Sequence, residues 1–279
     1  MEQITLKYGE ESQPLSLANA RLIIAHSEPH PDPEKAVREA LKTPIGLPPL
    51  AGICRPGEKV VIVTSDITRY TASEIYLPIL VEELNRAGII DADIDIVIAL
   101  GIHRKQTDAE HRRILGPLFG RIRVSDHECD DPQALVDRGV TASGLAVKVN
   151  RQVAEADRII VTGTVGLHYF AGFGGGRKSL VPGVASRETC MATHFAIFNP
   201  PEVGGKHPQA VAGKLDGNPV HAAILEAAQM LKPDFLFNTV LTPDKKIAHA
   251  FAGELNTAHL AACDAARPLY TVEIESGAD

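Results

Sequence analysis

The chain contains 279 residues, enough for one large domain or two ordinary ones at roughly 150 residues per domain. Its hydrophobic share of 44% can supply a packed core, whereas a net charge of −7 and the absence of Trp argue against a basic, aromatic-lined surface for nucleic acid. Its apolar runs are too short for a membrane span, and its first residues lack the pattern of a signal peptide. Four scattered cysteines favour reduced thiols and a cytoplasmic location, and they argue against a cysteine zinc site.

The N-terminal segment predicts short strands and one helix. Its three short apolar runs cover residues 4–8, 14–17 and 21–25. The first two alternate apolar and polar residues around Gly9, which is typical of a hairpin. Asp32 and Pro33 then have the N-cap and first-turn proline of a helix start. Residues 43–56 are rich in proline and glycine and predict a loop.

From residue 58 onward, strand-like runs alternate with helix-like segments. The predicted strands cover residues 59–64, 94–100, 122–126, 145–150, 158–162 and 235–241, with another beginning at 269. The predicted helices cover residues 74–87, a segment ending near 115, 187–198, 219–230 and 258–266. Near-continuous Val and Ile runs between helices imply a parallel sheet that is covered on both faces. The sequence therefore predicts an α/β fold, a Rossmann-like three-layer domain with a mostly parallel sheet and helices on both faces.

Chemically unusual loops follow three of these strands, after Thr64, Leu100 and Thr162. In sheets of this kind, ligands bind beyond the carboxyl ends of the strands. The first loop contains Asp66 and Arg69, which suit either a carboxylate substrate or a salt bridge at a helix N-terminus. The second contains His103 and the third His168. Each histidine alone could be structural, but two at one sheet edge also suit proton transfer near neutral pH.

The third loop is dense in glycine, with five glycines in eleven residues. The strand before it is expected to break at Gly163. Glycine at this density lets backbone N–H groups approach an anion, which predicts a site for an anion or a nucleotide-like ligand. The residues of this expected cradle are Gly174, Gly175, Gly176 and Ser179. Neither a P-loop nor a dinucleotide motif fits, because both require glycine where the chain has Arg177.

Two reactive side chains belong to the same region. Three roles remain open for Lys178: an ordinary surface lysine, a phosphate contact or a point of covalent attachment. The last is included because a lysine amine forms covalent links when its pKa is lowered. His194 lies sixteen residues later on a predicted helix. Two roles stay open for it, a metal ligand and an ordinary helix residue. The remaining histidines show no spacing that indicates a metal site.

Taken together, these residues resemble the lactate racemase family, the nickel-pincer enzymes that racemise or epimerise 2-hydroxy acids. The resemblance covers nearly the whole chain and rests on D-x-T-R at 66–69, G-x-H-R at 101–104 and HYFAGFGGGRKSLVPG at 168–183. The family cofactor is nickel pyridinium-3,5-bisthiocarboxylic acid mononucleotide. The resemblance implies that Lys178 carries this cofactor through a thioamide, that His194 binds the nickel, and that the glycine loop holds the phosphate.

The resemblance also implies the catalytic roles. His103 and His168 would be the proton-transfer pair, and Asp66 and Arg69 would line the substrate site. The substrate hydrogen would move as hydride to the pincer cofactor, because direct abstraction of this weakly acidic hydrogen would build a dianion. The implied partners are a small 2-hydroxy acid and the proteins that mature the cofactor, with no nucleic acid and no membrane. Protein made without those maturation proteins is expected to lack the cofactor.

Members of the family have a second domain that closes over the cleft. We therefore expect residues 1–270 to form the N-terminal cofactor-binding catalytic domain and residues 271–279 to begin a C-terminal domain that is missing. Such a domain alone is expected to racemise poorly or not at all. Two other functions stay open: a racemase or epimerase of another hydroxy acid or sugar acid, and a non-catalytic module that binds a nucleotide or carries the cofactor. A non-covalent association of the cofactor with Lys178 also stays open.

Overall fold

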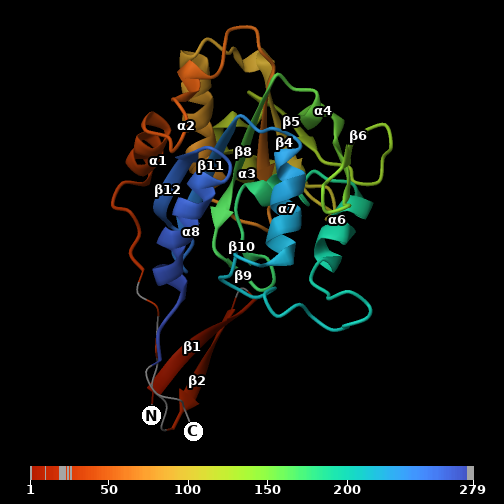
Figure 1. The fold of residues 1–279 in the computed structure, drawn as a ribbon. Coiled ribbons are helices and arrows are strands. Elements are labelled where there is room, and N and C mark those ends of the chain that lie inside the picture. Colours follow the sequence, from red (N-terminus) through yellow and green to blue (C-terminus); the bar gives the residue numbers. More distant parts are fainter. Residues whose placement is uncertain (1, 10, 19–22, 24, 26, 275–279) are drawn as a thin grey trace.

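A six-stranded sheet lies between two layers of helices in the computed structural model, which describes residues 2–9, 11–18, 23, 25 and 27–274 (Figure 1). The strand order is β12-β11-β8-β3-β4-β5, and only the edge strand β12 runs antiparallel to its neighbour. The strands are β3 (Val60–Ser65), β4 (Ile94–Ala99), β5 (Arg123–Asp126), β8 (Arg158–Val165), β11 (Phe235–Leu241) and β12 (Ile247–Gly253). The predicted α/β class with a mostly parallel sheet is confirmed.

Helices cover both faces of the sheet. One face carries α1 (Pro33–Lys42), α2 (Ser73–Arg86) and α3 (Asp108–Leu115). The other carries α4 (Arg151–Ala154), α5 (Arg177–Leu180) and α7 (Pro219–Gln229). Two further helices are α8 (Thr257–Tyr270), which packs on β11 and β12, and α6 (Arg187–Phe195), which packs on α7. None of the helices in the described part of the chain is both long and apolar enough to cross a membrane.

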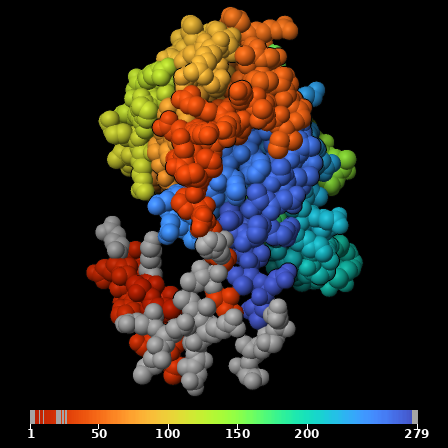
Figure 2. Space-filling view, turned by 90° about the vertical axis from the view of Figure 1, so that its left-hand side faces the viewer, coloured from red at the N-terminus to blue at the C-terminus, as the bar shows by residue number. Residues whose placement is uncertain are grey.

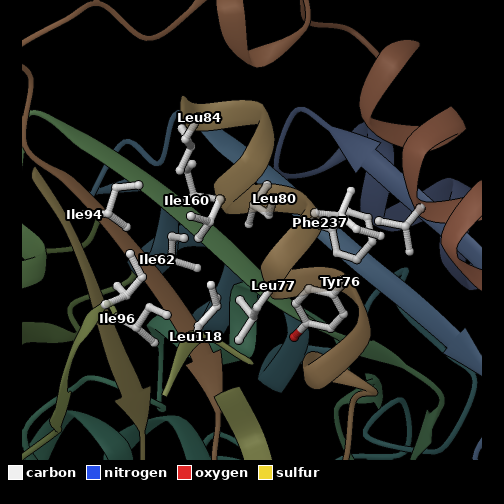
Figure 3. Packing of buried hydrophobic residues seen from close by; sticks show 14 of the residues in the cluster. Ile62, Tyr76, Leu77, Leu80, Leu84, Ile94, Ile96, Leu118, Ile160 and Phe237 are labelled. Atoms are coloured by element: carbon white, nitrogen blue, oxygen red, sulfur yellow. The ribbon is translucent and has the colours of Figure 1, made fainter. Parts of the chain in front are cut away.

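Alternation along the buried strands explains why two layers of helices are needed. Ile62 points to the α2 side of the sheet, whereas Val61 and Val63 point to the α5 and α7 side. Figure 3 shows Ile62 and other strand residues packed under the α2 side chains Leu77 and Leu80. Each fully buried side chain of this size contributes about 1.5–3 kcal/mol relative to its exposed state, so both faces must be covered.

The N-terminal hairpin stands apart from this body (Figures 1 and 2). It consists of β1 (Glu2–Tyr8) and β2 (Glu11–Leu17), as predicted. Most of the predicted run 21–25 lies outside the described residues. The next predicted element is confirmed, because the Asp32 side chain accepts a hydrogen bond from the Lys35 N–H at the start of α1.

Residues 145–150 do not join the main sheet, although they were predicted to. Strand β7 (Ala146–Asn150) instead pairs with β6 (Leu135–Val140) in a separate antiparallel ribbon. The physical reason is visible in its burial, since Ala146 and Lys148 are exposed and only one side of the strand is covered. The central strand β3, by contrast, is buried on both sides over Val60–Thr64.

The C-terminal predictions also need correction. The strand expected from residue 269 is wrong, because Leu269 and Tyr270 complete α8 and pack against the cluster around Phe173. The helix continues past Pro268 because its apolar side stays in contact with the sheet. Strand β12 escaped prediction because its alanine-rich sequence lacks the continuous Val and Ile pattern of the other strands.

The strand before the glycine loop does not break at Gly163, contrary to prediction. It continues to Val165, since Gly163 serves close packing rather than termination. A Cβ atom at Gly163 would lie 2.9 Å from the Gly176 nitrogen. The missing side chain therefore lets the start of α5 lie directly on β8.

Candidate active site

The predicted site residues, with one exception, line a single cavity of about 350 Å³ beyond the carboxyl ends of β3, β4 and β8. They are Asp66, Arg69, His103, His168, Gly174, Gly175, Lys178, Ser179 and His194. Gly176 is not part of the lining. Parallel strands explain the convergence, because their carboxyl ends meet at the same edge of the sheet. The size is typical of a site for a small organic ligand.

One side of the cavity, the carboxylate wall (Asp66, Arg69, His103), comes from the loops after β3 and β4. The Asp66 side chain is 1% exposed, and its Oδ2 atom lies 2.5 Å from His103 Nδ1. Its other oxygen accepts a hydrogen bond from Thr68 Oγ1 at 2.8 Å. Because the carboxylate can only accept from the ring, His103 carries a hydrogen on Nδ1 and its Nε2 is left to exchange protons.

Arg69 is the exposed cation of the carboxylate wall. Its backbone N–H donates to the Asp66 carbonyl oxygen at 3.0 Å, which fixes the turn. Within the described residues, its guanidinium makes no hydrogen bond and no ion pair. A guanidinium without a protein partner at a cavity wall is well suited to bind a carboxylate with two parallel hydrogen bonds.

A backbone contact ties the two sides of the cavity together. The Gly101 N–H, just before His103, donates to the Gly183 carbonyl oxygen at 2.8 Å. Gly101 has a φ of +57°, which favours glycine. A Cβ atom at Gly183 would lie 2.4 Å from the Ser179 carbonyl oxygen, so glycine is required there for close packing. This contact brings the His103 loop against the end of α5.

The opposite side, the lysine wall (His168, Lys178, His194), is built around Phe170. His168 ends β9 (Leu167–His168), which pairs with β10 (Gly172–Phe173). The Phe170 ring lies 4.5 Å from the His168 ring and 5.5 Å from the His194 ring, measured between centroids. Lys178 Nζ lies 5.7 Å from the same ring. Phe170 therefore contacts all three reactive side chains, a role that the sequence had not suggested.

His168 and Lys178 contact each other in a way that indicates their protonation. His168 Nδ1 accepts a hydrogen bond from the Ala171 N–H at 3.3 Å, and His168 Nε2 lies 3.4 Å from Lys178 Nζ. A neutral imidazole that accepts at Nδ1 carries its hydrogen on Nε2. The Lys178 amine must then accept that hydrogen, which it can do only in its neutral form.

Electrostatics favour the same protonation states. Burial is the main reason that the pKa of His168 is lowered, to about 3. Burial, with the charges of Arg177 and Arg69, lowers the pKa of Lys178 to about 7. A lysine amine that is partly neutral near pH 7 is a competent nucleophile.

His194 has the geometry of a potential metal ligand. Its Nδ1 donates to the Cys190 carbonyl oxygen at 2.7 Å, one turn earlier in α6, so the Nε2 lone pair is available. Cys190 also lines the cavity and was missed, although its spacing of four residues from His194 was visible in the sequence. Among the described residues, no group of three or more His, Cys, Asp or Glu side chains could hold a metal ion.

The glycine loop is used for packing more than for exposing its amides. The Gly174 N–H donates to the Gly166 carbonyl oxygen and the Gly176 N–H to Asn238 Oδ1, each at 2.8 Å. Ser179 Oγ donates to the Thr162 carbonyl oxygen at 2.7 Å. A Cβ atom at Gly176 would lie 2.3 Å from a Leu236 methyl carbon. These donors are engaged within the protein, so the expected anion cradle is not formed by them in this conformation.

Comparison with known proteins identifies close relatives. The model of the lactate racemase N-terminal domain matches residues 8–205. Two proteins named lactate racemase, from Lactiplantibacillus plantarum and Thermoanaerobacterium thermosaccharolyticum, are 37% and 35% identical to the chain over 240 residues. These alignments cover 86% of the chain and 55% of each relative. The chain thus spans little more than half the length of these relatives.

Solved structures show the same fold. The structure of the lactate racemase apoprotein from Thermoanaerobacterium thermosaccharolyticum matches with a TM-score of 0.83 and 32% identity, over 96% of this chain and 63% of that chain. A crystal structure of a protein from Thermotoga maritima matches with a TM-score of 0.65 and 25% identity, over 84% of this chain and 57% of that chain.

Proposed function

Because the chain belongs to the family of lactate racemase N-terminal domains, we propose that it is the catalytic and cofactor-binding part of a 2-hydroxy-acid racemase, an isomerase. The observation that supports this most is the convergence of five functional groups on one cavity. These are the free guanidinium of Arg69, the imidazoles of His103 and His168, the amine of Lys178 and the imidazole of His194. We also propose residues 1–270 as the cofactor-binding domain.

A small hydroxy acid suits the charge of this cavity. The substrate carboxylate would bind Arg69, which has no partner within the described chain. Asp66 does not compete with the substrate for the Arg69 guanidinium, because its two oxygens are already bound to His103 and Thr68. We propose that Asp66 acts on the substrate through His103, by holding the orientation of that ring, rather than by direct contact.

The two catalytic histidines would start in complementary states. His103, with its hydrogen on Nδ1, offers the Nε2 lone pair as a base. His168, which accepts at Nδ1, carries its single hydrogen on Nε2 in the cofactor-free protein, so it would act as the acid after taking up a second proton, as the imidazolium. One ring would take the hydroxyl proton of one enantiomer while the other returns a proton to the hydroxyl oxygen of the product. The roles exchange in the reverse direction, as a racemase requires.

The residues of the lysine wall fit the nickel pyridinium-3,5-bisthiocarboxylic acid mononucleotide cofactor. The Lys178 amine would attach it and His194 Nε2 would bind its nickel. When bound, the cofactor would supply an electrophilic pyridinium that accepts the α-hydrogen of the substrate together with its electron pair, so that no carbanion forms. Gly174, Gly175, Gly176 and Ser179 would shape the loop around it. Because the proposed cofactor is built by other enzymes, maturation proteins are proposed partners.

The proposal is tested by mass spectrometry and metal analysis of protein produced together with the cofactor-maturation enzymes. We expect a mass increment on Lys178 and one nickel per chain. Lys178→Ala should lose the increment, and His194→Ala should keep it while losing nickel. Lys206→Ala, at an exposed lysine, serves as the matched control and should change neither. Binding of ordinary nucleotides without metal or increment would instead indicate a non-catalytic binding module.

A further inference from the structure

Arg177, the residue directly before Lys178, is a cation buried without a carboxylate. Its side chain is 0% exposed. The guanidinium donates to the carbonyl oxygens of Gly174 at 3.2 Å and Phe173 at 3.4 Å, and to His221 Nδ1 at 2.9 Å. Its Nε atom is buried without a hydrogen-bond partner, and no carboxylate of the described residues pairs with it. Burying a cation in this way is costly, which indicates that the charge has a purpose.

The groups around this guanidinium cannot neutralise it. His221 accepts its hydrogen bond and is therefore neutral, and burial together with the Arg177 charge lowers the pKa of His221 to about 4. On α8, burial and the Arg177 charge lower the pKa of His259 well below its ordinary value. Burial raises the pKa of the Cys263 thiol to about 12 although Arg177 opposes this. The positive charge of Arg177 therefore remains uncompensated behind the glycine loop.

We propose that Arg177 is a positioning residue that keeps the neighbouring Lys178 amine neutral and holds it against His168. This inference rests on the proposed function, in which the Lys178 amine receives the cofactor. The guanidinium binds the carbonyl groups just before α5, and the Lys178 N–H donates to the Gly175 carbonyl oxygen at 2.8 Å. The start of α5 is thereby fixed, and the contact between His168 Nε2 and Lys178 Nζ requires a neutral amine.

Burial is the largest cause of the lowered pKa of Lys178, and among the charged groups Arg177 contributes most. Arg69, from the loop after β3, is exposed, so water screens its charge. His168, from β9, has its pKa lowered and is neutral. On α6, burial raises the pKa of the Cys190 thiol, and the His194 ring lies 5.5 Å from the Phe170 ring. Arg177 is the cation that is both adjacent to Lys178 and shielded from solvent.

The test is competitive acetylation of the cofactor-free protein with acetic anhydride over a range of pH, read for Lys178 by peptide mass spectrometry. In the unchanged protein we expect a midpoint near pH 7. Arg177→Met removes the charge and should raise the midpoint by about one pH unit or more. Arg177→Lys should raise it as well, because a lysine amine buried there without a carboxylate would be neutral.

A second pair of variants keeps the test decisive if Arg177→Met does not fold. His221→Glu leaves Arg177 in place and sets a carboxylate beside its guanidinium, which should also raise the midpoint. His221→Gln changes the side chain without adding charge and should not. An unchanged midpoint in His221→Glu, or equal shifts in His221→Glu and His221→Gln, would show that the Arg177 charge does not control the amine. Since no cofactor is needed, these outcomes are independent of whether the matured protein carries the mass increment.

Discussion

The carboxylate wall and the lysine wall present the same side chain, a histidine, in opposite settings. His103 is paired through Nδ1 with the buried carboxylate of Asp66, and its side chain is 43% exposed. His168 accepts a backbone N–H at Nδ1 and faces the Lys178 amine, with no carboxylate of the described chain against it. His103 is thus set to accept a proton at Nε2, whereas His168 is a neutral ring whose Nε2 hydrogen is directed at the Lys178 amine. The partner of Nδ1 therefore gives two identical side chains opposite tautomers.

The difference extends to what lies behind each wall. Behind His103, Thr68 binds the carboxylate and completes a chain of satisfied hydrogen bonds. Behind Lys178, Arg177 is buried with an unpartnered nitrogen. The first arrangement fixes orientation, while the second lowers the pKa of an amine at the expense of stability. The proposed cofactor attachment site and the proposed proton-transfer site need these different environments.

The largest expected effect comes from removing the carboxylate that distinguishes the two histidines. Asp66→Asn should lower the racemisation rate constant by about 10²–10⁴-fold, because His103 loses the acceptor that fixes its tautomer. Since the equilibrium constant between enantiomers is one, kcat/KM should fall equally in both directions, measured with chiral substrates and the complete matured protein. Thr68→Val, which removes only the hydroxyl bound to Asp66, should cost far less. Equal losses in the two variants would contradict the proposed pairing.

Removal of the free cation should affect substrate binding. Arg69→Met should raise KM for the hydroxy acid by about 10–100-fold, the equivalent of one charge-assisted hydrogen-bonded pair at about 1.5–3 kcal/mol. The measurement is steady-state kinetics of the matured protein. Arg138→Met, at an exposed arginine outside the cavity, is the matched control. A fall in kcat without a change in KM would argue that Arg69 does not hold the substrate carboxylate.

The lysine wall predicts a pH dependence of stability. The pKa of Lys178 is about 7 in the folded protein, against an ordinary value of 10.5. Between these values the unfolded chain binds more protons, so the free energy of unfolding should rise with pH, by at most about 1.4 kcal/mol per pH unit from this group. The penalty is complete below pH 7 and relieved towards pH 10.5.

Chemical denaturation of the cofactor-free protein at several pH values can isolate this contribution. Lys178→Met removes the titrating amine, so the difference in free energy of unfolding between the two proteins should change with pH only above pH 7. His168 adds a separate window, since its pKa of about 3 predicts that stability also rises between pH 3 and 6.5. A difference that is constant from pH 7 to 10 would mean that the Lys178 amine is not perturbed.

The smallest expected effect tests how the two walls are held together. The buried Tyr76 hydroxyl contacts Thr64 and Thr71, on the side of the carboxylate wall, and Thr162, which leads to the lysine wall. Figure 3 shows its ring beside Phe237 in the core. Tyr76→Phe should lower the free energy of unfolding by about 1–3 kcal/mol, because buried hydroxyls lose a partner. Tyr70→Phe, at a less buried tyrosine, provides the comparison in the same denaturation experiment.

Much of the scaffold follows from the sequence. Continuous Val and Ile runs identified the parallel strands, and local capping residues such as Asp32 and Ser186 located helix starts, because both signals depend on neighbours in the chain. The parallel arrangement then implied that loops distant in sequence would meet at one edge. For this reason the residue pattern placed Asp66, His103 and His168 at one edge of the sheet, and the resemblance to the lactate racemase family then implied their roles.

Only the tertiary structure decided how those residues work. The Asp66–His103 pair joins residues 37 positions apart, and the Arg177–His221 contact joins residues 44 positions apart, so no local pattern could reveal them. The same holds for Gly163. A glycine in a strand sequence predicts a strand break, and only the structure shows that Gly163 packs closely against Gly176. The sequence by itself determined which chemical groups reach the cavity, through strand periodicity and loop position. Side-chain packing between distant segments determined which are paired, which are neutral and which are left charged.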